Sequence, residues 1–219
     1  VDAEFLTRPN RFIAKVKFEG EIIDVHVKNT GRCRELLVPG ATVYLEDFRD
    51  NVRGRKLKFS LIGVEKKTKS GEILTINMDS QAPNKVVLES LKNGKIKLPG
   101  MDRIEYIKPE ARFGDSRLDF YVKDICGQEG YIEVKGVTLE DDGVASFPDA
   151  PTVRGIKHLK ELMGLKGNGY NAYVIFVIQM EGMKYFEPNI ERHPEFADAL
   201  KEAKKSGVNV LAYECCVTK

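Results

Sequence analysis

The chain has 219 residues, enough to bury one large hydrophobic core or two small ones. Its hydrophobic content of 42% and charged content of 31% are ordinary for a soluble globular protein. The longest apolar stretch, residues 172–178, has the length of a buried strand, whereas a membrane-spanning helix needs roughly 18 apolar residues. No basic segment followed by an apolar one opens the sequence, so nothing indicates a signal peptide. These features predict a cytoplasmic protein with no membrane partner.

The cysteines and the charge distribution narrow the function classes further. The four cysteines, Cys33, Cys126, Cys215 and Cys216, include no CxxC pair and predict neither a zinc site nor a disulfide framework. Residues 8–69 hold 15 Lys or Arg and 8 Asp or Glu, a net charge of +7, which leaves −5 for the remainder. This basic N-terminal part is a candidate phosphate-binding surface, and an ordinary solvated surface is the alternative.

The first 80 residues have the pattern of short strands joined by turns. Alternating apolar residues predict a strand at 11–18, and further strands are expected at 22–27, 42–48, 56–65 and 73–78. Five strands with little helix favour a small barrel of the OB type. An SH3-like barrel or an open meander would give the same pattern.

From about residue 81 onward the pattern changes to alternating helices and strands. Helices are expected at 86–91 and 151–163, and a third begins at Pro194 and ends before Gly207. Strands are expected at 117–123, 131–138, 172–179 and 208–213. This order predicts an α/β domain over residues 81–219, following an all-β domain over residues 1–80.

Two of these strands, residues 117–123 and 131–136, carry a cluster of charged residues. The even positions of both strands are apolar, and the odd positions include Asp119, Glu133 and Lys135. Because side chains alternate between the faces of a strand, the three charged groups share one face. A hairpin centred on Gly127 would place Asp119 opposite Lys135, with Glu133 on the diagonal.

Two neighbouring carboxylates repel each other, and a divalent cation relieves that repulsion. Oxygen ligands favour Mg²⁺ or Mn²⁺, which also hold phosphate oxygens and water. An adjacent lysine can activate water and neutralise charge in a phosphoryl transition state. The alternative is a solvent-exposed face with weak cross-strand ion pairs.

Asp119 followed by Glu133-Val134-Lys135 resembles the motif of the PD-(D/E)xK nuclease superfamily, although Leu118 stands where proline usually precedes the aspartate. A more specific resemblance, to the sugar fermentation stimulation protein A family, extends over nearly the whole chain. It is carried by the segments Arg8-Pro-Asn-Arg-Phe, Asn29-Thr-Gly-Arg32, Gln81-Ala-Pro-Asn84, Ser116-Arg-Leu-Asp-Phe120, Ile132-Glu-Val-Lys-Gly136 and Phe147-Pro-Asp-Ala-Pro-Thr152.

This resemblance implies an N-terminal OB-like barrel, a C-terminal restriction-endonuclease-like mixed sheet with flanking helices, and DNA binding. By analogy with nuclease-like folds, Glu89 on the preceding helix would be a further metal ligand, with Glu110 and Asp115 as rivals. Gln179, at the end of a buried strand, could reach the metal site or cap the strand.

Basic residues predict where nucleic acid would bind. Phe12, Tyr44, Phe48 and Phe59 could add stacking surfaces to them, or could be core residues. His158, four residues after Arg154 on one helix face, could contact phosphate or be merely structural. The candidate nucleic-acid contacts are Arg32, Arg34, Arg53, Arg55, Lys56, Arg117, Arg154 and His158.

The leading hypothesis is an Mg²⁺- or Mn²⁺-dependent nuclease of DNA or RNA. In it Asp119, Glu133 and Lys135 are catalytic, and Asp119, Glu133 and Glu89 hold the metal. The second hypothesis is a non-catalytic DNA-binding regulator that retains a nuclease-like fold. A protein-interaction scaffold is a third, but it would leave the basic N-terminal part unexplained. The sequence predicts no oligomeric state.

Overall fold

The N-terminal part of the chain forms a closed barrel. The structure, a computed structural model, describes all residues except 30, 51–53, 115 and 219, so the candidates Arg53 and Asp115 lie outside the described residues. The first sheet is ordered β3-β2-β1-β4-β5-β6, and an added parallel pairing of β3 with β5 closes β1 to β5 into a ring. Its strands are β1 (Asp2–Thr7), β2 (Ile13–Phe18), β3 (Glu21–Val27), β4 (Thr42–Asp47), β5 (Phe59–Lys67) and β6 (Ile73–Asn77).

This connectivity is that of an OB fold, which confirms the predicted barrel. The prediction of which five strands form the barrel was wrong in one respect. The strand β1 belongs to the ring and was not predicted, whereas β6 lies at the sheet edge outside it. The β1 strand is difficult to recognise because only Ala3 and Phe5 of its six residues are fully buried.

The C-terminal part is built on a mixed sheet ordered β14-β12-β9-β8-β7. The strand β12 runs parallel to β9 and β14, while β8 is antiparallel to both β9 and β7. A smaller sheet is ordered β10-β11-β13. The elements are α1 (Ala82–Lys92), β7 (Ile104–Phe113), β8 (Ser116–Asp124), β9 (Glu129–Val137), β10 (Leu139–Asp141), β11 (Val144–Phe147), α2 (Val153–Gly167), β12 (Asn171–Ile178), β13 (Tyr185–Pro188), α3 (Pro194–Lys205) and β14 (Asn209–Glu214).

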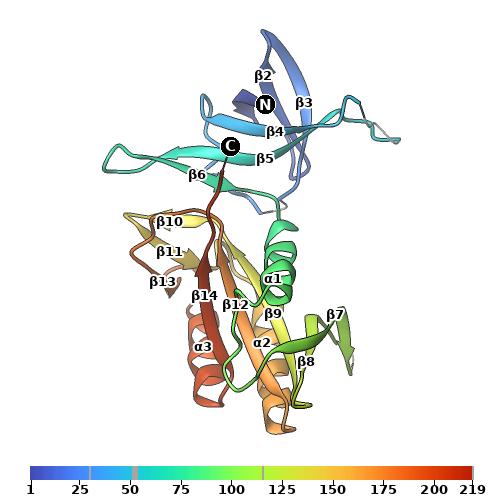
Figure 1. Cartoon of the computed structure of the whole chain (residues 1–219). Helices are drawn as coiled ribbons and strands as arrows, with labels where there is room; N and C mark the ends of the chain where they lie inside the picture. Colours follow the sequence, from blue (N-terminus) through green and yellow to red (C-terminus); the bar gives the residue numbers. More distant parts are fainter. Residues whose placement is uncertain (30, 51–53, 115, 219) are drawn as a thin grey trace.

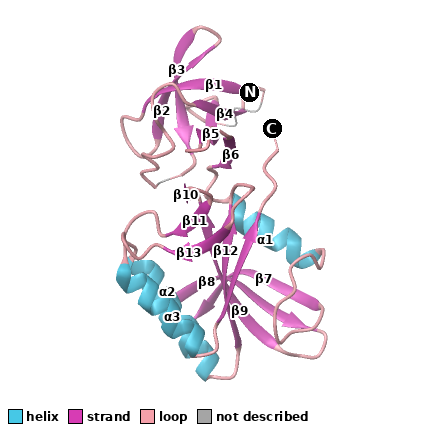
Figure 2. Cartoon of the chain, turned by 90° about the vertical axis from the view of Figure 1, so that its left-hand side faces the viewer, coloured by secondary structure: helices cyan, strands magenta, loops and turns pink. Residues whose placement is uncertain are grey.

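Helices cover both faces of the mixed sheet. Figure 2 shows α1 on one side and the neighbouring helices α2 and α3 on the other. Val87 and Leu91 of α1 pack with Ile132 and Ile175, and Leu159 of α2 packs into a second cluster on the opposite face. The strand β12 is buried along nearly its whole length because it lies between these two layers.

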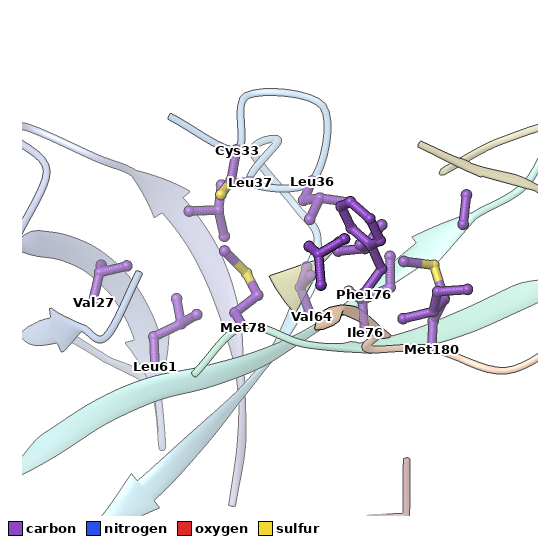
Figure 3. Packing of buried hydrophobic residues seen from close by; sticks show 14 of the residues in the cluster. Val27, Cys33, Leu36, Leu37, Leu61, Val64, Ile76, Met78, Phe176 and Met180 are labelled. Carbon is purple, nitrogen blue, oxygen red and sulfur yellow. The ribbon is translucent and has the colours of Figure 1, made fainter. Parts of the chain in front are cut away.

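The barrel and the mixed sheet share one hydrophobic cluster. Val64 and Ile76 from the barrel lie beside Phe176 from β12, and Met78 and Met180 extend the same cluster (Figure 3). The backbone N–H of Asn77 also donates to the carbonyl of Gln179 at 2.9 Å. Figure 1 shows α1 beginning directly beneath the barrel, so the first turn of this helix lies at the junction.

Candidate active site

The β8–β9 hairpin sets the geometry of the charged cluster. Lys123 pairs with Glu129, so the turn is centred on Cys126 and not on Gly127 as predicted. The Asp124 carboxylate stabilises this turn by accepting hydrogen bonds from the backbone N–H groups of Cys126 and Gln128. Moving the centre of the turn by one residue shifts the strand pairing by two residues. The register that ends at Phe120 and Ile132 therefore directs Asp119 toward Glu133. The prediction that Asp119 faces Lys135 was wrong. Asp119, Glu133 and Lys135 still share one face of the sheet, because a register shift of two residues keeps each side chain on the same face.

Asp119 lies where β8 and β9 separate. The regular pairing of the two strands ends at Phe120 and Ile132. Beyond that point, Asp119 Oδ2 accepts the backbone N–H of Val134 at 2.7 Å, and Asp119 Oδ1 accepts Asn84 Nδ2 at 2.8 Å. The half-buried carboxylate is therefore held from two sides, by β9 and by α1.

Glu133 is 3% exposed and lies beneath α2. Its Oε1 accepts hydrogen bonds from Lys135 Nζ and His158 Nδ1, whereas its Oε2 is buried without a partner among the described residues. The alternative of a solvent-exposed face is thus wrong, because α2 covers this side of the sheet. A buried carboxylate oxygen without a partner is costly unless a ligand completes its coordination.

His158 and Arg154 extend the cluster along α2. Arg154 Nε donates to His158 Nε2 at 3.3 Å, so His158 Nδ1 carries the hydrogen that Glu133 accepts. His158 is 7% exposed, and its hydrogen bond holds the Glu133 carboxylate in place. Its ring is buried and both ring nitrogens have partners within the protein, so the structure gives no support to the prediction that it contacts nucleic acid.

The electrostatics of the two carboxylates differ. Burial, together with the charge of Glu133, raises the pKa of Asp119, although its two hydrogen bonds oppose this. Burial also opposes ionisation of Glu133, but the hydrogen bonds from His158 and Lys135, together with the charge of Lys135, outweigh it and lower the pKa of Glu133. A cation between the two carboxylates would relieve the repulsion that acts on Asp119.

The donor set fits a hard divalent cation held partly by water. Asp119 and Glu133 supply carboxylate oxygens, and Mg²⁺ is commonly bound by one or two carboxylates together with waters and substrate phosphates. The structure does not bring the predicted third ligand, Glu89, to this pair. Glu89 lies on the exposed side of α1, five residues beyond Asn84, and no three acidic, His or Cys side chains of the described residues form a metal-binding group.

Sequence reasoning assigned no role to Asn84. The residue stands in the segment Gln81-Ala-Pro-Asn84, which carried part of the family resemblance and was the available signal. Pro83 occupies the first turn of α1, where its missing N–H costs nothing, and this fixes the helix start that aims Asn84 at Asp119.

The predicted basic contacts are distributed over several places. Arg55 and Lys56 line a barrel pocket with Lys28, Lys85 and Phe48, and the Arg55 guanidinium lies 3.6 Å from the centre of the Phe48 ring. Arg32 and Arg34 line a different pocket. Arg117 is exposed and lies 3.5 Å from Glu110.

The predicted stacking aromatics have different environments. Phe59 is buried and belongs to the core, whereas Phe12 is exposed beside Arg11. Tyr44 donates its hydroxyl to Glu65. Phe48 is the aromatic that combines partial exposure with surrounding cations.

Comparison with known proteins identifies the family. The profile described as "Sugar fermentation stimulation protein RE domain" matches residues 81–219, and "SfsA N-terminal OB domain" matches residues 6–75. The chain belongs to the sugar fermentation stimulation protein family. A homolog of this family from Desulfitobacterium hafniense (strain Y51) is 52% identical over 219 residues, covering 100% of this chain and 90% of the homolog. One from Clostridium beijerinckii is 53% identical over 214 residues, covering 98% and 89%.

A solved family member has the same fold. The structure of Pyrococcus furiosus SfsA in complex with Ca²⁺ superimposes with a TM-score of 0.83 at 31% identity, covering 97% of this chain and 87% of the other. In the present chain, no helix within the described residues combines the length and apolar character needed to cross a membrane.

Proposed function

We propose that this protein is a metal-dependent nuclease that hydrolyses phosphodiester bonds in DNA or RNA. The observation that carries the proposal is the arrangement of Asp119, Glu133 and Lys135 at the point where β8 and β9 separate. Two carboxylates of different pKa beside a lysine ammonium form a group that can bind a cation and a phosphate together.

Asp119 and Glu133 would hold the metal, Mg²⁺ or Mn²⁺. When bound, the ion supplies Lewis-acid activation of a phosphoryl oxygen and lowers the pKa of a water molecule. Two observations support the assignment: the unpartnered Oε2 of Glu133, and the complex that the related Pyrococcus furiosus SfsA forms with Ca²⁺. Ca²⁺ accepts the same oxygen ligands.

The remaining residues of the cluster have separate tasks. Lys135 places a positive charge where a phosphate would approach, orients the attacking water and offsets charge that develops on the phosphoryl oxygens. Asn84 fixes the Asp119 carboxylate, and His158 fixes Glu133. Both act as positioning residues, since their polar atoms are already bound to the carboxylates.

The barrel would bind the sugar–phosphate backbone of the strand. The pocket that contains Arg55, Lys56 and Lys28 also includes Lys85 of α1, the residue next to Asn84. A strand held there by phosphate contacts therefore lies close to the helix turn that holds Asp119.

Incubation with labelled single-stranded DNA, duplex DNA and RNA in Mg²⁺, Mn²⁺ or EDTA tests the proposal. We expect cleavage that requires the metal and falls by at least about 100-fold in Asp119→Asn, Glu133→Gln and Lys135→Met. Lys123→Met, which removes a lysine of the same hairpin outside the cluster, should retain wild-type activity.

Cleavage that persists unchanged in all three cluster variants would refute the assignment and indicate a contaminating nuclease. Salt-sensitive DNA binding without cleavage in any metal would favour the second function, a regulator that binds DNA without cutting it.

A further inference from the structure

A small pocket at the junction of the barrel and the mixed sheet takes no part in the proposed hydrolysis. It has a volume of about 290 Å³. Asn29 and Gly31 line it from the barrel, Ser80 lines it from the connection to α1, and Gly136 and Gln179 line it from the mixed sheet. Gly136 directly follows Lys135 on β9, so one wall of the pocket is formed by the strand that carries the catalytic cluster.

The lining of this pocket differs from that of the barrel pocket in charge. Its described lining contains no lysine or arginine, and Asp149 is its one ionisable side chain. The barrel pocket, in contrast, contains Lys28, Arg55, Lys56 and Lys85. A phosphate would meet the carboxylate of Asp149 and no lysine or arginine in the described lining, whereas neutral amide and hydroxyl groups suit the edges of a base or the hydroxyls of a sugar.

Gln179 is the most informative residue of the pocket. It is 4% exposed, and its main chain is fixed on both sides, by Val137 of β9 and by Asn77 of the barrel. Its side-chain Oε1 is buried with no hydrogen-bond partner among the described residues. A buried amide oxygen without a partner, held rigidly at a pocket wall, is destabilising unless a bound ligand donates a hydrogen bond to it.

Gly136 keeps the pocket wall close to α1. A Cβ at this position would lie 2.9 Å from Pro83 Cγ and 3.2 Å from Gln179 Nε2. The absence of a side chain therefore lets the Gln179 amide approach the main chain of β9 at Gly136.

We propose that this pocket binds one unpaired nucleoside of the substrate strand, next to the phosphate at the catalytic cluster, and that Gln179 reads the edge of its base. The proposal rests on the proposed function, since it assumes a nucleic-acid strand at Lys135. The volume suits one nucleoside and excludes a stretch of duplex. Direct hydrogen bonding to the base requires that it be unpaired or flipped from its stack.

Binding measurements that do not depend on cleavage test this inference. Fluorescence anisotropy is recorded in Ca²⁺ with 12-nucleotide single strands in which one abasic site is moved along the strand. We expect one position at which loss of the base weakens binding by about 10-fold in the wild type. In Gln179→Leu that position dependence should disappear, and the intact and abasic strands should bind alike.

Two comparison variants separate the pocket from general effects. Gln128→Leu, in the exposed hairpin turn, should retain the wild-type position dependence. Arg55→Ala should weaken binding of every strand by a similar factor, because phosphate contacts carry no base information. If Gln179→Leu fails to fold, as judged by its melting temperature, Asn29→Ala tests the same pocket from the barrel side.

The inference would be overturned if the position of the abasic site had no effect on binding to the wild type. It would also be overturned if Gln179→Leu and Asn29→Ala both showed the same position dependence as the wild type. Position dependence without metal-dependent cleavage would refute the nuclease proposal and leave the pocket supported. Cleavage without position dependence would refute the nucleoside pocket and leave the nuclease proposal supported, so the two failures are distinguishable.

Discussion

In the proposed metal site, Asn84 would position a metal ligand without binding the metal itself. Its hydrogen bond orients one oxygen of Asp119. We expect Asn84→Ala to weaken Mn²⁺ binding by about 10- to 100-fold, the usual effect of removing a partner that orients a metal ligand. Isothermal titration calorimetry measures this directly. Glu89→Ala, on the exposed side of the same helix, should leave the affinity unchanged, and equal losses in both variants would contradict the geometry.

Asp149 is a second single residue with a predicted effect, in this case on how stability depends on pH. Burial and the neighbouring charge of Glu35 raise the pKa of its carboxyl in the folded state. A folded pKa above the unfolded one means that the contribution to stability is complete below the unfolded pKa and is lost as pH rises through the folded pKa. Asp149→Asn removes this titration. The free energy of unfolding of the variant, relative to wild type, should therefore increase as the pH rises above about 4 in urea titrations, and a pH-independent difference would contradict the shift.

The sequence predicts the residues of the cluster but not their partners. Alternation along two strands places Asp119, Glu133 and Lys135 on one face, since the period of a strand is fixed. The hairpin register depends on the turn around Cys126, which the Asp124 carboxylate stabilises, and alternation contains no information about it. The contacts of Asn84 arise from tertiary packing between distant segments, so local patterns do not predict them.

At the level of elements, the start of α2 determines where Arg154 and His158 lie. The predicted start at residue 151 was two residues early, because Thr152 is the N-cap and its side chain accepts the backbone N–H of Gly155 at 3.0 Å. We expect Thr152→Ala to reduce the free energy of unfolding by about 1 kcal/mol, measured by urea denaturation. Thr152→Ser retains the accepting oxygen and should lose much less.

Strands at the margins of the sheets are the elements that the sequence does not predict. The edge strand β7 contains Pro109 and many exposed charged residues, so it lacks the apolar alternation of an inner strand. The strands β10, β11 and β13 have three or four residues each, too few to show a period. The long amphipathic helices and the buried strand β12 were predictable because each presents a continuous apolar pattern.

At the scale of the whole molecule, a buried ion pair joins the barrel to the smaller sheet. Lys66 Nζ of β5 lies 2.6 Å from Glu140 Oε2 of β10, and the Glu140 side chain is 1% exposed. Lys66→Met leaves this carboxylate buried without its counter-charge, and we expect a loss of about 3 kcal/mol in the free energy of unfolding.

The matched control is Lys69→Met, which removes a pair with Asp141 whose side chains are 70% and 73% exposed. Exposed pairs contribute little, so this variant should keep nearly all of the wild-type stability. Guanidinium denaturation of both variants gives the comparison. Equal losses would show that the Lys66 pair does not hold the two parts together.

The shared core around Ile76, Met78 and Phe176 has a mechanical consequence. Since the barrel is packed against the end of β12, it cannot swing to follow a bound strand as a tethered module would. A strand bound as proposed, to both the barrel pocket and the hairpin cluster, must bend along a rigid frame. Duplex DNA is stiff over about 150 base pairs, whereas single strands and frayed ends adapt at small cost. The stiffness of the nucleic acid is therefore itself a basis for selection, before any base is recognised.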